Sequence, residues 1–423
     1  MIEIPSPEVL ATALTRHSPR RDTHDGWCTW RDTRHTFSPA PRLTLGEWRG
    51  LSPQHRSIHD LHRTATHVNM PMLETPMSRK VSRLINRRAR NNALKCKPAT
   101  RAGVLVTGWG YQGKTETACE VLAAFEQDWL MLHGYRNPNT VEGTRDIHAP
   151  VAYIQTPVTA KPKSTCQAIL DFFGADTKRL TLPELIRQVS NSLHDHGVKV
   201  LVLDDITRLR MHRADDQDTL DLIRALMSMN VTLILIGVDI PGSGLLREGK
   251  WDGRSRQWVL PPSQRARVHG LEATQTERRF DMVELDRFRY TTTDQIAAFH
   301  DHLTGLENNL RLLNARPGML TSGTMPEYLM RRTDGVVGLL ERLIEDGAQE
   351  AMDSGRELLD EDLLDEVILS LDDPGRDAAA GEVPTIPGSQ GGTTTDRPRK
   401  SRGKAPRNTV FDDHGPESAQ LGS

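Results

Sequence analysis

Five short runs of apolar residues interrupt an otherwise polar chain, and segments with helical periodicity separate them. The runs are "GVLVTG", "VAYIQTP", "VKVLVLDD", "VTLILIGVD" and "DMVELDRF", all between Gly103 and Phe288. Unbroken runs of Val, Ile and Leu are typical of strands that are buried on both faces of a parallel sheet. Because these strands alternate with helices, the sequence predicts an α/β fold with a five-stranded parallel sheet.

Helical periodicity lies on both sides of this α/β region. It runs from Leu45 to Ala93, where prolines interrupt it, and again from Arg289 to Leu371. The residues after Leu371 are rich in Gly, Pro and Thr, which predicts a disordered tail. We therefore divide the chain into an N-terminal extension, an α/β domain with a basic lead-in helix, a helical region and a tail, over residues 1–70, 71–289, 290–371 and 372–423.

Composition and charge restrict the classes of function. The chain has 54 basic and 56 acidic residues, so any affinity for nucleic acid must come from local patches. No apolar run approaches the roughly 18 residues of a membrane span, and "MIEIPSPEVL" does not resemble a signal peptide. The four cysteines are widely spaced, which indicates reduced thiols. We expect a soluble, cytoplasmic protein with no membrane partner.

One stretch, "GVLVTGWGYQGKTETA" from Gly103 to Ala118, fits two nucleotide-binding patterns. The shorter "GWGYQG" fits the dinucleotide pattern G-x-G-x-x-G, and "GWGYQGKT" fits G-x-x-x-x-G-K-[ST], the phosphate loop of ATPases. Both patterns bring backbone N–H groups against phosphate at the N-terminus of a helix. They predict different ligands.

Residues outside the glycines favour the ATPase pattern. Its lysine reaches the β- and γ-phosphates and its hydroxyl ligates Mg²⁺, whereas a dinucleotide site needs an acid after the second strand, which here ends "YIQTP". The third strand delivers Asp204, expected to hold the Mg²⁺ shell, and Asp205, expected to orient the attacking water. We predict ATP and Mg²⁺ as ligands, bound through Gly108, Gly110, Gly113, Lys114, Thr115 and Glu116 for the nucleotide and through Thr115 and Asp204 for the metal.

A pair of arginines in "TERRF" lies directly before the last strand. An Arg-Phe pair at this point looks like the arginine finger of AAA+ proteins, which stabilises transition-state charge at a neighbouring subunit's γ-phosphate. Arg279 is the better candidate for this catalytic role, and Arg278 is the second. The alternative is that both are solvated cations at a helix end.

Several segments together resemble the TniB/TnsC-type transposon ATPases, AAA+ proteins related to the phage Mu target-selection ATPase. They are "GVLVTGWGYQGKTE", "VAYIQTPVTAKPKSTCQAILDFFGA", "HGVKVLVLDDITRL", "LILIGVD", "RRFDMVEL" and "RTDGVVGLLERLI". The resemblance covers roughly residues 65 to 370. It implies a P-loop NTPase of AAA+ type with a small C-terminal helical lid. It also implies an ATP-dependent homo-oligomer on DNA that recruits or activates a DDE-type transposase.

The sequence departs from this family at three positions. The second acid of the third strand is usually Glu and is Asp205 here, and catalysis is sensitive to a displacement of ~1 Å. Asp239 stands where AAA+ proteins generally have Asn, Thr or Ser. The lid position that often carries an arginine is Gly338, with Arg342 one turn later. We therefore expect slow hydrolysis that is stimulated by assembly.

Basic residues concentrate before the first strand. The segment from Thr75 to Arg101 has no acid and predicts a surface for duplex DNA with little choice of sequence, through Arg79, Lys80, Arg83, Arg87, Arg88, Arg90, Lys95, Lys97 and Arg101. The alternative is a solvated face or one paired with acids. The tail run "RPRKSRGKAPR" adds a basic arm.

The spacing of His55, His59 and His62 fits one helix face, but no cysteine completes a metal site.

These observations predict an ATP-dependent regulator of DNA transposition, with hydrolysis driving disassembly. Two alternatives stay open. One is a helicase loader-like AAA+ protein, which would assemble on single strands. The other is a nucleotide-gated protein scaffold with little hydrolysis.

Overall fold

The chain folds into two compact units. The computed structural model describes residues 18–136, 148–158, 161–208, 217–243, 245–246, 250–252, 254, 257–259 and 276–369. The α/β unit combines Ser18–Arg34 with Met77–Asp286, and the helical unit combines His35–Pro76 with the chain from Arg287 onward. The predicted tail and its basic run lie outside the described residues, as do residues 1–17.

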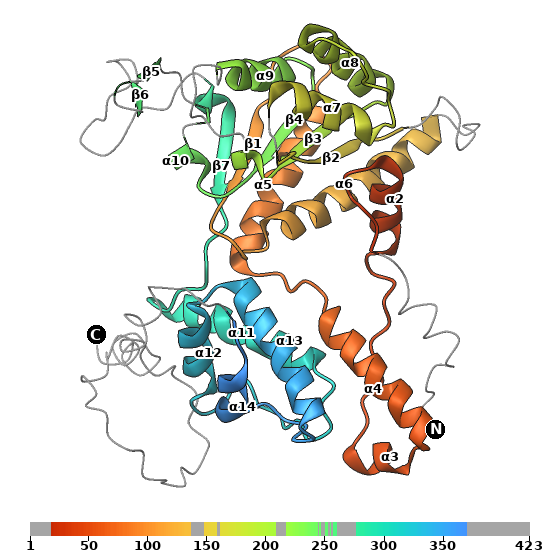
Figure 1. The fold of residues 1–423 in the computed structure, drawn as a ribbon, viewed down its shortest axis with the longest axis vertical. Helices are drawn as coiled ribbons and strands as arrows, with labels where there is room; N and C mark the ends of the chain where they lie inside the picture. Colours follow the sequence, from red (N-terminus) through yellow and green to blue (C-terminus); the bar gives the residue numbers. More distant parts are fainter. Residues whose placement is uncertain are drawn as a thin grey trace. The chain divides into compact units, whose positions relative to one another are not determined.

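Five parallel strands form the centre of the α/β unit (Figure 1). Their order is β2-β3-β4-β1-β7, and each neighbouring pair is parallel. This confirms the predicted sheet, whose strands are β1 (Gly103–Thr107), β2 (Val151–Gln155), β3 (Val200–Asp204), β4 (Thr232–Ile236) and β7 (Phe280–Glu284). A separate antiparallel pair, β5 (Lys250–Asp252) and β6 (Gln257–Val259), was not predicted.

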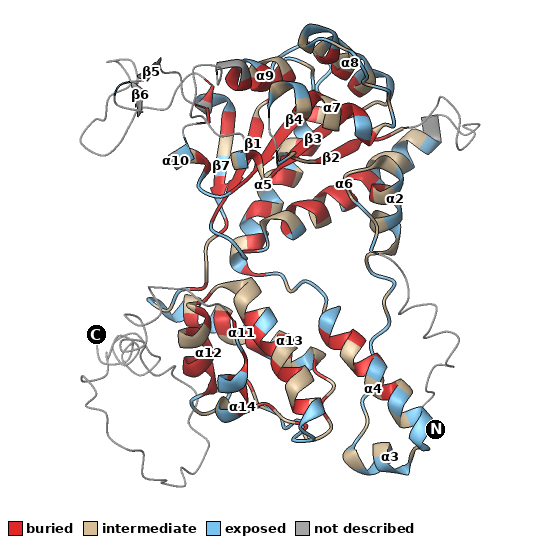
Figure 2. Ribbon diagram, viewed as in Figure 1, coloured by how far each residue is buried: buried red, intermediate tan, exposed pale blue. Residues whose placement is uncertain are grey.

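Helices cover both faces of this sheet, which explains why its three central strands, β3, β4 and β1, have no exposed side. Figure 1 shows α7 (Pro162–Phe172), α8 (Leu182–Asp195) and α9 (Gln217–Met227) on one face and α5 (Pro76–Ala93) and α6 (Lys114–Arg136) on the other. Every residue of β1, β3 and β4 is buried (Figure 2). Because both faces of these strands are buried, successive residues are apolar, and these apolar runs are the pattern by which the strands were predicted. Short elements at the strand ends are η1 (Ile206–Arg208), α10 (Ile240–Ser243) and η4 (Glu277–Arg279).

An N-terminal helix, α2 (His24–Thr33), belongs to the α/β unit. No sustained period in the sequence predicted it. The fully buried Trp27 donates from Nε1 to Glu126 Oε2 at 2.5 Å, and Arg31 Nη1 lies 2.9 Å from the same oxygen. Glu126 Oε1 accepts the backbone N–H of Val151 at 3.1 Å. One buried carboxylate thus joins α2, α6 and the start of β2. Burial raises the pKa of Glu126, and the charge of Arg31 opposes that shift.

The helical unit is built from α3 (Leu45–Gly50), α4 (Pro53–Val68), α11 (Thr293–Asn309), α12 (Met325–Thr333), α13 (Val337–Asp353) and α14 (Glu361–Glu366). Helix α13 contacts α4, α12 and α14. Its buried side chains recur three and four residues apart, at Leu340, Leu343, Ile344 and Ala348, so one stripe of the helix faces this core. No helix in the described part of the chain is long and apolar enough to cross a bilayer.

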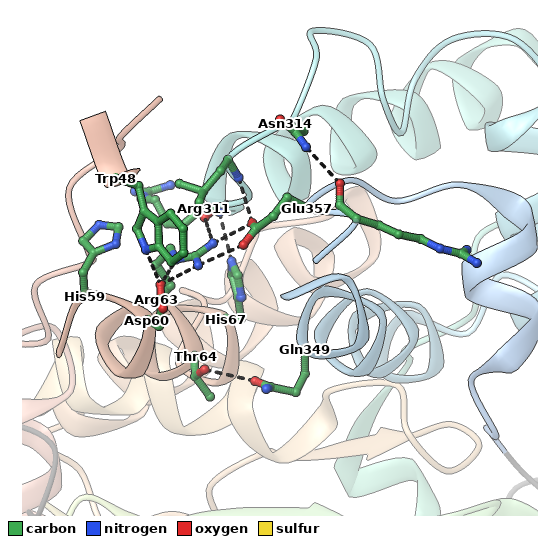
Figure 3. Close-up of polar contacts among 12 residues, drawn as sticks. Trp48, His59, Asp60, Arg63, Thr64, His67, Arg311, Asn314, Gln349 and Glu357 are labelled. Atoms are coloured by element: carbon green, nitrogen blue, oxygen red, sulfur yellow. Dashed lines mark hydrogen bonds and ion pairs between the residues drawn. The ribbon is translucent and has the colours of Figure 1, made fainter. Parts of the chain in front are cut away.

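A buried arginine joins α4 to the C-terminal part of this unit (Figure 3). Arg63 is 1% exposed and contacts both carboxylate oxygens of Glu357, at 2.7 and 3.0 Å, as well as Asp60 Oδ1 at 2.6 Å. Nearby, His67 Nε2 accepts the backbone N–H of Arg311 at 2.9 Å. Because a buried charge needs full pairing, these contacts fix where α4 packs within its unit.

Candidate nucleotide and metal site

The glycine-rich loop between β1 and α6 depends on two backbone positions that exclude larger residues. Gly108 has a φ of 149°, and a Cβ at that position would lie 2.4 Å from the carbonyl oxygen of Leu285. Gly113, directly before α6, has a φ of 75°. Gly110 has open space around it. Both positions therefore favour glycine, in agreement with the glycines of the predicted phosphate loop.

Lys114 and Thr115 form the first turn of α6. Lys114 Nζ donates to the carbonyl oxygen of Trp109, so its ammonium group lies over the loop. Burial lowers the pKa of Lys114, and the charges of Asp204 and Asp205 oppose this shift. The predicted phosphate-binding cation is thus held beside the loop, near the two acids at the end of β3.

Asp204 ends β3 and is buried, with both of its carboxylate oxygens in use. Oδ2 accepts the hydroxyl of Thr115 at 2.7 Å and that of Tyr153 at 2.6 Å, and Oδ1 accepts the backbone N–H of Asp205 at 2.8 Å. The structure therefore brings together the two residues predicted to bind metal. A hydroxyl and a carboxylate are both oxygen ligands of the kind that Mg²⁺ takes, so this donor set fits the ion.

Asp205 follows Asp204 in a left-handed conformation, with a φ of 52°. Its Oδ2 accepts Gln155 Nε2 at 2.6 Å and lies 2.9 Å from Arg208 Nη2. Among the described residues its Oδ1 has no hydrogen-bond partner, so this oxygen is open to water. That geometry is compatible with the predicted role of Asp205 in orienting a water molecule.

Three residues predicted from the family pattern lie near the ends of the last strands. Asp239 is exposed after β4, with a φ of 43°, and its carbonyl oxygen accepts the N–H of Ser243. Arg278 and Arg279 are exposed in η4, directly before β7. Neither guanidinium contacts an acid within the part of the chain that the structure describes. Both the finger and the solvated-cation interpretation of these arginines fit this placement.

The departures predicted in the lid lie on α13 of the helical unit. Gly338 is in its first turn. Arg342 Nε lies 3.3 Å from Asp346 Oδ2, and its Nη1 donates to the carbonyl oxygen of Leu369 at 3.3 Å. Arg342 therefore already has two partners within its own unit.

The predicted histidine row lies on α4, where two of its members contact backbone carbonyl oxygens and the third contacts a hydroxyl. His59 Nε2 lies 3.1 Å from the carbonyl oxygen of Pro41, and His62 Nε2 lies 2.8 Å from that of Ser38. His55 contacts the hydroxyl of Ser52. The described residues contain no group of three or more His, Cys, Asp or Glu side chains placed to hold a metal ion.

Helix α5 carries most of the basic block. Its buried face, which includes Val81, Ile85 and Ala89, packs in the core of the α/β unit. Arg88 pairs with Asp281 and Arg90 with Asp128, so the alternative of pairing with acids holds for these two. In the described structure Arg83 and Arg87 are exposed and have no ion-pair partner. Arg101, also in the predicted patch, is buried.

Sequence reasoning missed two groups of residues around the acids. Tyr153 and Gln155 alternate along β2, and Gln155 is directly opposite Asp204 in the ladder. Polar residues with this period of two, beside a strand that ends in acids, are a signal that could have been used. Arg21, which binds Glu116, comes from a segment that no local pattern connects to the loop.

Part of the chain matches a known protein family. Residues 99–240 match the family model described as an AAA domain. Similar solved structures include the Aeropyrum pernix ORC1 protein in complex with DNA, with 14% identity, a TM-score of 0.48, and coverage of 71% of this chain and 67% of that one. A Walker-type ATPase of Pyrococcus abyssi has 16% identity and a TM-score of 0.34, covering 67% and 71% respectively. RuvB of Thermotoga maritima has 14% identity and a TM-score of 0.34, covering 68% and 66%.

No curated protein matches the chain. The sheet order, the loop before α6 and the family match together give the α/β unit the fold of a P-loop nucleoside triphosphatase (NTPase) of AAA+ type, as predicted.

Proposed function

We propose that this protein is a cytoplasmic, ATP-dependent, DNA-binding regulator of DNA transposition. It assembles with ATP as a homo-oligomer on duplex DNA and recruits or activates a DDE-type transposase, and hydrolysis drives disassembly. The observation that carries the nucleotide part of this proposal is the 2.7 Å contact between Thr115 and Asp204 beside Lys114. These residues come from the first turn of α6 and from the end of β3, and an ATPase needs all of them in one place.

Each residue of the site has a separate task. The loop amides and Lys114 bind the β- and γ-phosphates, and Thr115 and Asp204 hold Mg²⁺, which when bound neutralises charge on those phosphates. Asp205 orients the water through its open Oδ1. Gln155 and Arg208 hold the other oxygen of Asp205, so they limit how far its shorter side chain can turn. Arg279 stabilises the developing charge in a neighbouring copy.

Arg83 and Arg87 support the DNA part of the proposal. They lie four residues apart on the exposed face of α5, so they point the same way and present two positive charges that no acid of the described residues pairs with. Contacts of this kind are to the DNA backbone and carry little sequence information. The resemblance to TniB/TnsC-type ATPases supports transposition as the process that the DNA-bound oligomer regulates.

The nucleotide site is tested by Lys114→Ala, which should abolish ATP binding because it removes the cation at the β- and γ-phosphates. Binding can be measured by the fluorescence of a labelled ATP analogue. Unchanged affinity in this variant would remove the basis of the proposal.

The DNA surface is tested by Arg83→Ala with Arg87→Ala. Each lost phosphate contact should lower the slope of log K against log salt by about one, with similar weakening on unrelated duplexes. Lys163→Ala with Arg187→Ala removes the same charge from exposed positions on α7 and α8 and serves as the control. An equal loss in both pairs would mean that only total charge matters. ATP-dependent preference for single strands over duplex would instead favour a helicase loader.

A further inference from the structure

Tyr153 reaches the metal-binding carboxylate from the neighbouring strand. It lies in the middle of β2, is 3% exposed, and donates its hydroxyl to Asp204 Oδ2 at 2.6 Å. The same oxygen accepts the hydroxyl of Thr115, while Oδ1 accepts the N–H of Asp205. Because donors bind both oxygens, the plane of the carboxylate is fixed before any ion arrives.

The N-terminal segment fixes the ring of Tyr153 in turn. Trp27 of α2 stacks on this ring, with centroids 5.9 Å apart and planes 12° from parallel. The guanidinium of Arg21 lies 5.6 Å from the ring centroid and 5.1 Å from that of Trp30. Trp27 and Arg21 therefore hold the ring of Tyr153 in place, with its hydroxyl directed at Asp204.

Arg21 also contacts the helix that follows the loop. It forms two hydrogen bonds to the carboxylate of Glu116, at 2.8 and 3.0 Å, in the first turn of α6. The turn that carries Lys114 and Thr115 is thus connected to the ring that positions Asp204. The N-terminal segment therefore contacts a neighbour of each predicted metal ligand: Glu116 beside Thr115, and Tyr153 beside Asp204.

We propose that Tyr153 is a positioning residue for Asp204, and that its hydroxyl, held in place by Arg21 and Trp27, sets the Mg²⁺ concentration at which the protein binds ATP. This inference rests on the proposed nucleotide site. A carboxylate without its outer hydrogen-bond partner turns more freely, so it must be ordered each time that the ion binds. Loss of such partners typically lowers metal affinity about 10–100-fold.

The test is Tyr153→Phe, which removes the hydroxyl and keeps the ring between Trp27 and Arg21. Binding of a fluorescent ATP analogue is measured across a Mg²⁺ titration and in EDTA. The Mg²⁺ concentration for half-maximal binding should rise about tenfold or more. Affinity in EDTA should stay at the wild-type value, because Lys114 and the loop are intact.

Tyr328→Phe is the matched control, since Tyr328 also donates to a carboxylate, Asp365 Oδ1 at 2.7 Å, but in the helical unit. It should leave the Mg²⁺ requirement unchanged, and melting curves verify that both variants fold. If Tyr153→Phe does not fold, Arg21→Gln loosens the ring without removing the hydroxyl, and the Mg²⁺ requirement should again rise.

Three results would overturn the proposal: a wild-type Mg²⁺ requirement in the folded test variant, an equal shift in Tyr328→Phe, or an equal loss of affinity with and without Mg²⁺. The proposed nucleotide site fails in a different way, through an absence of ATP binding in the wild-type protein or its persistence in Lys114→Ala.

Discussion

Arg21 and Glu116 are 95 positions apart in the chain and form a two-pronged ion pair, with Nη2–Oε1 at 2.8 Å and Nη1–Oε2 at 3.0 Å. Glu116 was predicted to belong to the nucleotide site, and this pair gives its carboxylate a definite partner next to Lys114 and Thr115. Because Arg21 also lies over the rings of Trp30 and Tyr153, the ion pair connects residues 18–34 to the first turn of α6.

Arg21→Gln should loosen α2 while the sheet stays intact. The pair is partly exposed, so its loss should cost about 1 kcal/mol and speed local hydrogen exchange about fivefold. Hydrogen–deuterium exchange of residues 24–33 measures this effect. Arg20→Gln is the control, since the partner of Arg20 among the described residues is Asp22, at the surface. Equal exchange in the two variants would contradict the role of Arg21.

Gly108→Ala should destabilise the α/β unit, because the new Cβ would lie 2.4 Å from the carbonyl oxygen of Leu285 at a φ that favours glycine. We expect a loss of about 1–3 kcal/mol in the free energy of unfolding. Gly110→Ala has space for its methyl group and should change stability by less than about 0.5 kcal/mol. Urea denaturation of both variants tests this difference, and a neutral Gly108→Ala would show that the loop relaxes without cost.

Arg279→Ala should bind ATP normally and lose most of the assembly-stimulated hydrolysis, since finger arginines contribute about 10³–10⁵ in rate. ATPase activity measured against protein concentration tests this expectation. Mixing Arg279→Ala with Lys114→Ala subunits should restore part of the activity, because an intact Lys114 can then face an intact Arg279. Full activity in Arg279→Ala alone would rule out this residue and turn attention to Arg278.

Acid should destabilise the helical unit through His302. Burial lowers the pKa of His302 to about 4, so the folded state holds it neutral. Below its ordinary pKa of 6.5 the unfolded chain binds the proton more readily, and stability is lost as the pH falls from about 6.5 through about 4. The full effect is on the order of 3 kcal/mol.

His302→Phe tests this pH dependence, because a similar ring can pack against Phe288, whose centroid lies 5.1 Å away. Thermal unfolding between pH 7 and pH 4 should show a shallower loss of stability in this variant than in the wild type. His55→Gln removes an exposed histidine and should follow the wild-type curve. A slope that His302→Phe leaves unaltered would assign the acid sensitivity to other groups.

The sheet could be predicted from the sequence because burial on both faces produces a local sequence pattern, the apolar runs of β1, β3 and β4. The contact between Thr115 and Asp204 was also predictable, since parallel strands end at one edge of the sheet. Those features depend on short segments and a known topology.

The surroundings of the site could not be predicted in the same way. Arg21 and Trp27 contact residues 95 and 99 positions later, and no periodicity links segments so far apart. The predicted basic face on α5 also needed the structure. The spacing of Arg83, Arg87, Arg88 and Arg90 gives their directions on the helix, but Asp281 and Asp128, which neutralise the last two, come from distant elements.

Arg63, the buried arginine of α4, is synthesised long before the residue that pairs with it. Arg63 precedes its partner Glu357 by 294 positions, so at about 5–20 residues per second the ribosome makes them roughly 15–60 s apart. The complete five-stranded sheet is translated within that interval. The α/β unit can therefore fold while α4 still lacks its partner, and the helical unit, although α4 precedes the whole sheet in the chain, is the last to be completed.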